Sequence, residues 1–398
     1  MADGVNRVFR RNHYASPIHC IYGAMRAPKQ GEVGLEGNRQ SYDRTSVDLR
    51  RIDAHPDYWY PVAWSDEIRN GHLVTRPFAG EPIVIYRNTV GRLFALEDRC
   101  AHRQVPLSKG VVTGDNIRCG YHGWTYDGAS GRCTDIPYMP GDRLARGVRS
   151  YPVREIDGLV FIFPGNTVFA DARAPSKLAR ASDETYKTRR LNRQIACHYT
   201  FCHENLFDMN HQFLHRKQMG MVKARGLGQR RGDDWCEVDY AFQRSEGRGG
   251  FGERTILGLF RRRRGAGDEP GRGRALMTVR TEYPHQRLRI WVGGGEPSLD
   301  VWLCYTPLDK AQRTNRTFGY LSVKRPALPG VLDLVWPAVT WFTENIFRED
   351  QQIMELEQVA HDAQGADWNR EIFPAINELR AVLSSCGQPS DDCSVSTP

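Results

Sequence analysis

Short apolar runs separated by turn-forming residues characterise residues 46–165. The runs 82–86 and 93–96 are rich in apolar strand-forming residues, and the segment between them, 88–91, is a polar turn sequence that ends in glycine. Such a pair predicts a β-hairpin. The run 159–163 follows an Asp-Gly pair, which favours a tight hairpin turn. We therefore predict an all-β domain of many short strands over residues 46–165.

The second half of the chain changes from short runs to longer strands and a helix. Four apolar segments separated by polar connections predict antiparallel strands, at 275–279, 288–292, 299–305 and 317–323. After them, apolar residues recur near helical spacing as far as about Gln364, which predicts a long helix. We place Pro337 in the first turn of this helix, where its missing N–H costs no hydrogen bond. These elements predict an α+β domain over residues 191–385.

The remaining segments show little apolar periodicity. Residues 1–45 are polar and rich in Arg and Gly, so we predict a flexible N-terminal arm. Residues 166–190 contain few large apolar side chains and are interpreted as a linker with some helix. Residues 386–398 are predicted to be a frayed C-terminal tail. The chain is long enough to hold the two domains that this division requires.

Composition places the chain among globular proteins, since 40% of its 398 residues are hydrophobic and 26% are charged. It contains no apolar run of about eighteen residues, so we expect no transmembrane helix and no membrane partner. The N-terminus lacks the apolar segment of a secretory signal. Most of the ten cysteines are interpreted as reduced thiols, because they follow no disulfide-like spacing. We therefore expect a cytoplasmic protein.

The net charge of +8 raises the question of nucleic-acid binding. Part of this charge forms one run, Arg261–Arg264, which leads into a Gly-rich segment without large apolar residues. No aromatic residues alternate with these arginines, as a nucleic-acid surface would require. A solvated loop is the simpler interpretation, and we expect no nucleic-acid partner. Positive surface also suits the docking of an acidic electron-donor protein.

Two Cys–His pairs form the clearest chemical motif in the sequence. Cys100 and His102 stand two residues apart, and Cys119 and His122 stand three apart after a short interval. Two thiolates and two imidazoles are the ligands of a [2Fe-2S] cluster with two cysteines on one iron and two histidines on the other. Neutral imidazoles lower the negative charge of such a cluster, which raises its reduction potential. The motif therefore predicts an electron-transfer centre.

A structural zinc site is the alternative, because Zn²⁺ also accepts two Cys and two His. Zinc fingers usually place both cysteines before both histidines, whereas here the two residue types alternate. The sequences C-A-H and C-G-Y-H-G-W resemble the two ligand loops of Rieske proteins. The glycines at 120 and 123 would let backbone N–H groups approach the cluster. This resemblance favours the iron–sulfur interpretation over zinc.

A second group of metal-binding residue types follows at 203–215. On a helix, His211 and His215 would project from one face, one turn apart, and together bind one cation. Asp208, three residues before His211, would lie on the same face and accept the ring N–H of that histidine. Two histidines and one carboxylate are the usual ligands of a mononuclear Fe(II) that activates O2. An H-x3-H pair alone is weak support for such a site.

The missing carboxylate must come from another part of the chain. The predicted C-terminal helix offers four, Glu344, Glu349, Asp350 and Glu355. We expect one of them to reach the metal and three to lie on a solvated face.

Taken together, these motifs resemble the oxygenase α-subunit of the Rieske non-heme iron oxygenases, over most of residues 50–385. The family motif N-x2-D-x2-H…H is matched by Asn205, Asp208, His211 and His215. The resemblance implies that Asp350 is the third iron ligand and that Asp208 and Asn205 have catalytic roles. The two histidines are often five residues apart in the family and are four apart here, so His203 is an alternative to His215.

The family resemblance also implies the fold and the assembly. The expected fold class is α+β, with an all-β Rieske [2Fe-2S] domain followed by a catalytic domain of helix-grip or START-like type, an antiparallel sheet flanked by helices. A homotrimer with head-to-tail contacts is implied, in which Asp208 would join His122 of one subunit to His211 of the next. Such a carboxylate accepts hydrogen bonds from both imidazoles.

The function implied is that of a terminal oxygenase, which uses O2 and electrons to oxygenate a small organic, aromatic or cyclic substrate. The sequence contains no convincing nucleotide-binding fingerprint, so a ferredoxin or an NAD(P)H-dependent reductase must supply the electrons. Mono-oxygenation, as hydroxylation or oxidative demethylation, is the preferred reaction, and cis-dihydroxylation of a ring is the alternative. A Rieske electron carrier without oxygenase activity is a third hypothesis, which leaves the second half of the chain unexplained.

Overall fold

The structure, a computed structural model, describes residues 47–139, 146–176, 178, 180, 182–246, 276–292 and 295–390. Residues from Val47 onward form one compact unit. The predicted arm, the arginine run at 261–264 and residues 391–398 of the predicted tail lie outside the described residues.

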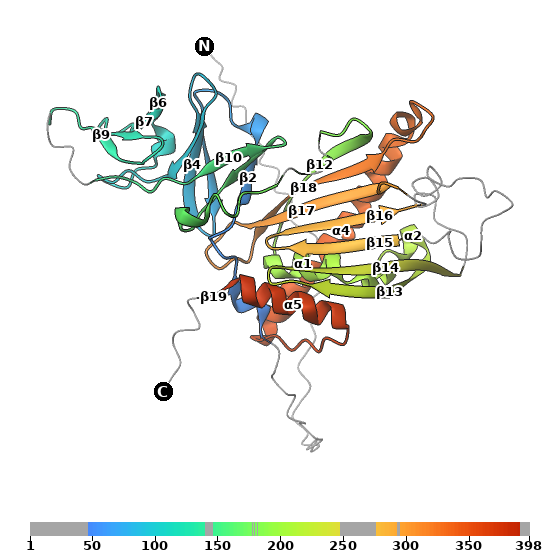
Figure 1. Cartoon of the computed structure of the whole chain (residues 1–398). Coiled ribbons are helices and arrows are strands. Elements are labelled where there is room, and N and C mark those ends of the chain that lie inside the picture. The colour runs from blue at the N-terminus through green and yellow to red at the C-terminus, as the bar shows by residue number, and fades with distance from the viewer. Residues whose placement is uncertain are drawn as a thin grey trace, which may run out of the picture. The chain divides into compact units, whose positions relative to one another are not determined.

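Three small antiparallel sheets build the first domain (Figure 1). One has the strand order β10-β11-β2, with β10 at Val153–Ile156, β11 at Leu159–Ile162 and β2 at Tyr60–Trp64. The next has the order β3-β4-β5, at Leu73–Phe78, Glu81–Arg87 and Leu93–Glu97. The third has the order β6-β7-β8-β9, at Val111–Thr113, Asn116–Arg118, Thr125–Asp127 and Cys133–Asp135. The prediction of an all-β first domain is confirmed.

Local turn chemistry explains why the predicted hairpins form. Between β4 and β5, the side-chain oxygen of Asn88 accepts hydrogen bonds from the N–H groups of Val90 and Arg92, at 3.1 and 2.7 Å. Between β10 and β11, Asp157 and Gly158 both have positive φ angles, of 49° and 80°. This is the backbone conformation that a two-residue hairpin turn requires.

A seven-stranded antiparallel sheet forms the centre of the second domain. Its strand order is β12-β18-β17-β16-β15-β14-β13. The strands are β12 at Tyr186–Ile195, β13 at Met221–Arg231, β14 at Trp235–Glu246, β15 at Leu276–Glu282, β16 at His285–Trp291, β17 at Leu299–Pro307 and β18 at Asn315–Lys324. The four strands predicted in this region are confirmed. Strand β12 begins inside the predicted linker, and β13 and β14 were not predicted. The glycines and arginines of β13 hide any alternation, whereas β14 does alternate from Cys236 to Phe242 and was overlooked.

Helices cover one face of this sheet (Figure 1). They are α1 at Tyr199–Phe207, α4 at Val331–Gln364 and α5 at Pro374–Cys386, and the short α2 at Arg216–Met219 follows α1. Helix α1 contacts β15, β17, α4 and α5. Apolar residues of these helices and of the inner sheet face share one buried core. The predicted α+β class, an all-β domain followed by an antiparallel sheet with flanking helices, is confirmed.

The predicted position of Pro337 is wrong. Helix α4 begins at Val331, so Pro337 lies inside the helix and not in its first turn. Its missing N–H leaves the helical hydrogen bond to the carbonyl of Asp333 unmade. The Pro-Gly pair that precedes Val331 starts the helix earlier than the apolar spacing suggested, since Gly330 has a left-handed backbone conformation, with φ of 78°.

Short elements connect and close the two domains. They are the 3-10 helices η2 at Leu49–Arg51, η3 at Ser65–Glu67, η4 at Leu107–Lys109, η5 at Thr167–Phe169 and η6 at Met209–Phe213. Strand β1 at Ile52–Asp53 pairs with β19 at Gln388–Pro389, so the start of the predicted tail is ordered by pairing. Among the described residues, no helix is both long enough and apolar enough to cross a membrane.

Gly131 provides a test of the packing in the first domain. It has a φ of +71°, and a Cβ atom on it would lie 2.0 Å from the carbonyl oxygen of Val148. We expect Gly131→Ala to lower the free energy of unfolding by roughly 2–4 kcal/mol, because backbone strain and overpacking add. Chemical denaturation of the holoprotein measures this.

Gly114→Ala is the matched control for Gly131→Ala. Gly114 also has a positive φ, of +62°, but a Cβ atom on it would have no neighbour within 4 Å. Gly114→Ala should therefore lower the free energy of unfolding by only about 1–2 kcal/mol, the cost of a side chain in a left-handed backbone conformation. Equal losses for the two variants would contradict the close contact at Gly131.

Candidate metal centres

Two tight loops at one end of the first domain carry the four predicted cluster ligands. The first follows β5 and is closed by the hydrogen bond from the N–H of Cys100 to the carbonyl of Val105, at 2.9 Å. The second joins β7 to β8 and is closed by the bond from the N–H of Cys119 to the carbonyl of Trp124, at 2.8 Å. The strand pairs thus hold two loops, each of which presents one cysteine and one histidine.

Of the four predicted ligands, the two cysteines are buried and the two histidines are exposed. Cys100 and Cys119 are 2% and 4% exposed, and their sulfur atoms interact with each other. The rings of His102 and His122 are exposed and their centroids lie 4.6 Å apart. This donor set fits a [2Fe-2S] group held by two thiolates inside the domain and by two imidazoles at its surface, where electrons can enter and leave.

The backbone of the second loop is built for a thiolate. Gly123 has a φ of +74°, which turns the chain back and places the N–H groups of Tyr121 and His122 near the sulfur of Cys119. Burial raises the pKa of the Cys119 thiol, and these two N–H groups lower it, while the neighbouring Cys100 raises it again. The net shift is upward, so the thiolate depends on a cation for its stability.

A tyrosine hydroxyl reaches the other cysteine. The Oη atom of Tyr126 lies 3.1 Å from the Sγ of Cys100 and accepts a hydrogen bond from the N–H of Ala101, at 3.1 Å. Since the hydroxyl has one proton and that N–H is a donor, the Tyr126 proton points to the sulfur when Cys100 is a thiolate. Sequence reasoning missed this contact, and its only signal there is the presence of a tyrosine after the second loop.

Three donor atoms from distant parts of the chain converge in the second domain. His211, His215 and Asp350 each offer one ligand atom, and these atoms lie within 4.8 Å of one another. The Oδ1 of Asp350 is 3.1 Å from the Nε2 of His215 and 3.6 Å from the Nε2 of His211. Among the described residues, this is the only such group of three found for a mononuclear ion.

The chemistry of these atoms fits a divalent metal. The Nε2 of His215 and the Oδ1 of Asp350 are buried and face each other at 3.1 Å, but neither makes a hydrogen bond of regular geometry with any described residue. Unpaired buried polar atoms are costly unless a ligand satisfies them. Burial lowers the pKa of His215, but the nearby carboxylates of Asp350 and then Glu349, which stabilise the protonated ring, raise it by more. The negative charge that raises this pKa also attracts a metal cation.

The other nitrogen of each histidine ring is already engaged. The Nδ1 of His215 lies 2.7 Å from the Oε2 of Glu349, and the Nδ1 of His211 faces the backbone carbonyl of Asp208. Both acceptors require a proton on Nδ1, which leaves the Nε2 lone pairs free for the metal. The contacts thus fix the tautomer and the orientation of both rings.

Two expectations about this segment are wrong. His211 and His215 do not lie on one α-helix, because Asp208 ends α1 and its side chain caps the 3-10 helix η6, while His215 is the N-cap residue of α2. Within this chain, the carboxylate of Asp208 does not accept the ring N–H of His211. Its Oδ1 binds the backbone N–H and the side-chain nitrogen of Asn210, at 2.8 and 3.0 Å.

The four carboxylates of α4 do not split into one metal ligand and three solvent-exposed side chains, as the sequence predicted. Asp350 faces the histidines as expected, but none of the other three simply faces solvent. Glu344 pairs with two arginines of β12, Glu355 accepts from the N–H of Ala196, and Glu349 holds His215. The role of Glu349 was missed, since it depends on a contact between residues 134 positions apart.

The structure also separates the two alternatives for the second histidine. His203 lies on α1, is fully buried, and packs edge-on against Tyr305 at a centroid distance of 4.9 Å. Burial lowers the pKa of His203 to about 3. It is not among the three converging residues, whereas His215 is. Asn205 is half-buried on α1, one turn before Asp208.

Comparison with known families agrees with both centres. Residues 58–152 match the Rieske [2Fe-2S] domain, and residues 195–379 match the vanillate O-demethylase oxygenase C-terminal domain. A 4β-methylsterol monooxygenase from Methylococcus capsulatus is 29% identical over 350 residues, which cover 84% of this chain and 89% of that protein. The chain therefore belongs to the Rieske non-heme iron oxygenases, as an oxygenase α-subunit.

Solved structures share the fold. The crystal structure of dicamba monooxygenase bound to dicamba has a TM-score of 0.64 and 22% sequence identity, and the match covers 85% of this chain and 98% of that one. The oxygenase of carbazole 1,9a-dioxygenase, solved in a complex with a ferredoxin, has a TM-score of 0.58 and 22% identity, with coverage of 85% and 91%.

This membership settles the class of protein and its cofactors. The chain is an oxidoreductase whose first domain binds a [2Fe-2S] cluster and whose second domain has the His-His-Asp site of a mononuclear non-heme iron. The zinc alternative and the electron-carrier alternative are both wrong, because the two halves of the chain match the two domains of an oxygenase.

Removing the Tyr126 hydroxyl tests its contact with Cys100. We expect Tyr126→Phe to lower the cluster reduction potential by some tens of millivolts, because a hydrogen bond to sulfur stabilises the reduced, more negative cluster. A net hydrogen bond of about 1 kcal/mol corresponds to about 40 mV for one electron. Redox titration of the visible absorption measures the shift. Tyr86→Phe is the control, since the Tyr86 hydroxyl binds the carbonyl of Asp115, and an equal shift there would contradict the assignment.

Removing the Glu349 carboxylate tests its hold on His215. We expect Glu349→Ala to weaken Fe(II) binding by about 10–100-fold, the usual effect of losing a partner of a ligand histidine. Glu349→Gln retains an acceptor oxygen and should lose less. Anaerobic equilibrium dialysis with Fe(II) measures both. Glu355→Gln, on the same helix, is the control and should bind Fe(II) like the parent. Unchanged affinity in Glu349→Ala would show that Glu349 does not position His215.

Proposed function

We propose that this protein is the terminal oxygenase component of a multicomponent Rieske system and that it mono-oxygenates an apolar, cyclic organic substrate. The observation that carries the proposal is the convergence of His211, His215 and Asp350, with both Nδ1 atoms already held by acceptors. Two histidines and one carboxylate leave several metal positions open, which an O2-activating iron requires.

Each residue has a defined role in this proposal. His211, His215 and Asp350 hold Fe(II), and Cys100, His102, Cys119 and His122 hold the [2Fe-2S] cluster. When bound, the two metal groups supply the electron transfer and the oxygen chemistry. Glu349 keeps the His215 ring in the binding tautomer. The chain itself contributes the position of these donors and an environment that excludes water.

The apolar packing of the domain that holds the iron ligands supports an apolar substrate. Half-buried hydrophobic side chains pack against the core on the helices and on the sheet: Leu206 on α1, Ile346 and Phe347 on α4, Phe242 on β14 and Ile290 on β16. The buried polar side chain of Gln286 on the same sheet face is satisfied by Tyr305, Thr281 and the carbonyl of His203. A substrate rich in rings and poor in charge suits this environment. The relatives named for methylsterol and dicamba act on cyclic compounds.

The electron donor is proposed to be an acidic ferredoxin or reductase. Burial lowers the pKa of His102, and so do His122, Arg103 and Arg146 through their positive charge. The field around the exposed imidazoles is therefore positive, which favours an acidic partner. The carbazole dioxygenase relative, solved with a ferredoxin, forms a complex of this kind. A cytoplasmic location suits such a partner and the free thiols of the described cysteines.

A homotrimer is also proposed. The half-buried carboxylate of Asp208 uses only its Oδ1 in hydrogen bonds with described residues. Its Oδ2 is available for His122 of a neighbouring subunit, as the family resemblance implies. The mass of the assembly by light scattering tests this, and a monomer that turns over would contradict it.

Labelled oxygen separates mono-oxygenation from the alternative, cis-dihydroxylation. The protein is combined with a ferredoxin, a reductase, NADH and ¹⁸O2, with 4β-methylsterol, dicamba, vanillate and carbazole as test substrates. We expect one labelled oxygen per turnover in the hydroxylated product or in the aldehyde released by demethylation. Two labelled oxygens on adjacent ring carbons would replace our proposal by a dioxygenase.

Removing an iron ligand tests the site itself. We expect His211→Ala and Asp350→Ala to lower turnover by more than about a thousandfold, because the iron supplies the chemistry. The visible spectrum of the cluster should stay unchanged, since its ligands lie in the other domain. Glu355→Gln is the control on α4. Turnover close to that of the parent in both ligand variants would refute the assignment.

A further inference from the structure

We propose that Asp48 and Arg50 act as positioning residues for the mononuclear iron site, by linking the two helices on which its ligands depend. We call this pair of residues the Asp48–Arg50 link. The inference rests on the proposed function, since it concerns the same site, and it adds two residues from the segment just before the first strand, β1.

The iron ligands come from two separate segments. His211 and His215 follow α1 directly, whereas Asp350 lies on α4. Metal–ligand distances must hold within about 0.2 Å. A small shift of α1 relative to α4 therefore changes the distance from the Oδ1 of Asp350 to the Nε2 of His215, which is 3.1 Å. Contacts that join these two helices control the shape of the site.

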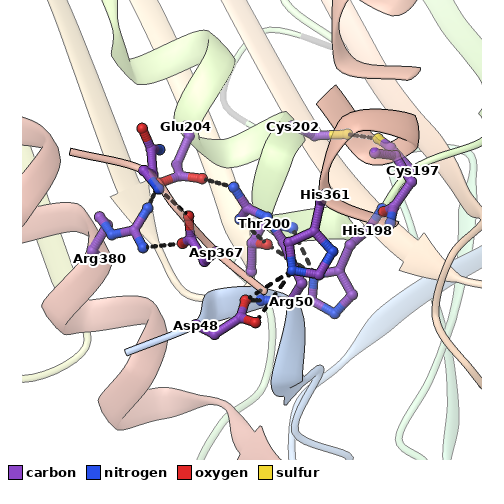
Figure 2. A network of polar contacts seen from close by, with 12 residues as sticks. Asp48, Arg50, Cys197, His198, Thr200, Cys202, Glu204, His361, Asp367 and Arg380 are labelled. Carbon is purple, nitrogen blue, oxygen red and sulfur yellow. Dashed lines mark hydrogen bonds and ion pairs between the residues drawn. The ribbon is translucent and has the colours of Figure 1, made fainter. Parts of the chain in front are cut away.

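One arm of the link reaches α1 (Figure 2). The guanidinium of Arg50 donates from Nη1 to the Oγ1 of Thr200, at 2.5 Å, and pairs through Nη2 with the carboxylate of Glu204. It also lies over the ring of Phe201, at 3.4 Å from the centroid. The Arg50 side chain is 3% exposed. Its contacts thus lie along one side of α1, from its first turn to its second.

The other arm reaches α4 (Figure 2). Both carboxylate oxygens of Asp48 lie 3.2 Å from the Nε2 of His361, which stands about three helical turns beyond Asp350. The Oδ1 of Asp48 also accepts the backbone N–H of Arg50, at 3.0 Å. The contacts with α1 and those with α4 therefore start from the same short segment at the start of η2. A shift of one helix is transmitted through this segment to the contacts with the other helix.

The charges of this network are better suited to fixing geometry than to adding stability. Glu204 is shared by Arg50 and Arg380, and Arg380 also binds Asp367. Burying such groups costs several kcal/mol per ion, so well-packed apolar residues often give equal stability. A guanidinium fork between a carboxylate and a hydroxyl, however, fixes direction as well as distance. The network therefore favours a positioning role for the Asp48–Arg50 link.

The experiment breaks each arm separately and then both. Arg50→Gln removes the contacts with α1, and His361→Phe removes the contact with Asp48 while it keeps a ring in place. Neither residue is an iron ligand. Fe(II) affinity is measured by anaerobic equilibrium dialysis of the full chain with its cluster intact, and thermal unfolding is recorded in parallel.

We expect each single variant to weaken Fe(II) binding by about 5–10-fold, less than the loss of a direct partner of a ligand. The effect stays limited because the N–H of His198 still binds the Oε1 of Gln358 and joins α1 to α4 directly, at 2.8 Å. The double variant should bind Fe(II) with the same affinity as whichever single variant binds less tightly. The loss of either set of contacts already breaks the connection between α1 and α4 through the Asp48–Arg50 link, so the second substitution has nothing further to break. Arg50→Lys, which retains the charge, should recover part of the affinity.

Arg190→Gln is the matched control. It breaks the ion pair of Arg190 with Asp66, which joins neither α1 nor α4, and should leave Fe(II) affinity unchanged. A lower melting temperature with unchanged Fe(II) affinity in Arg50→Gln and His361→Phe would overturn the proposal, as would losses that multiply in the double variant. If Arg50→Gln does not fold, the Fe(II) affinities and melting temperatures of Arg50→Lys and His361→Phe are compared by the same criteria. Failure of the parent itself to bind Fe(II) would instead refute the proposed function.

Discussion

The position of helix α4 on the inner face of the seven-stranded sheet is the constraint on which the iron site depends. Asp350 has no local relation to His211 and His215, and only this packing brings the three donors within 4.8 Å of one another. The sheet supplies the common surface, because α1 contacts two of its central strands and α4 contacts β12 at its edge. The His-His-Asp site of this chain therefore depends on a long-range packing interaction.

The metal-binding side chains of the two centres are positioned by different kinds of structure. In the first domain, short hairpins hold two loops, and the cysteines are buried while the histidines are exposed. In the second domain, the Nε2 of His215 and the Oδ1 of Asp350 are buried without a regular hydrogen bond to any described residue, and Glu349 and the Asp208 carbonyl fix the two histidine rings. The exposed centre suits exchange of electrons with another protein, and the buried centre suits chemistry that must exclude water.

Local features of this fold were predictable from the sequence, and non-local ones were not. The hairpin at 88–91 depends on hydrogen bonds made by Asn88 to its own neighbours, so its sequence contains the full cause. The four predicted cluster ligands were likewise recognisable because they lie in two short local motifs. By contrast, Glu349 and Arg50 look like ordinary surface charges, because their partners His215 and Glu204 lie 134 and 154 residues away. The same limit explains why Asp350 was selected by family resemblance and not by spacing.

The errors of prediction have physical causes as well. An H-x3-H spacing suits an α-helix, but Asp208 is a good N-cap residue and interrupts the helix before His211. Strand β13 carries glycines and arginines in place of regularly spaced apolar residues, which weakens its alternation, whereas β14 alternates and was overlooked. Pro337 is tolerated inside α4 because the packing of a long helix outweighs one missing hydrogen bond.

The most direct test of the two-centre account is the metal content and EPR spectrum of the anaerobically purified, reduced protein. The account predicts about three irons and two acid-labile sulfides per chain, with the signal of a reduced Rieske cluster. In Asp350→Ala it predicts about two irons, the same two sulfides and the same cluster signal. Two irons in the parent chain, or an equal iron content in the parent and in Asp350→Ala, would contradict the second centre. A protein without sulfide would contradict the first.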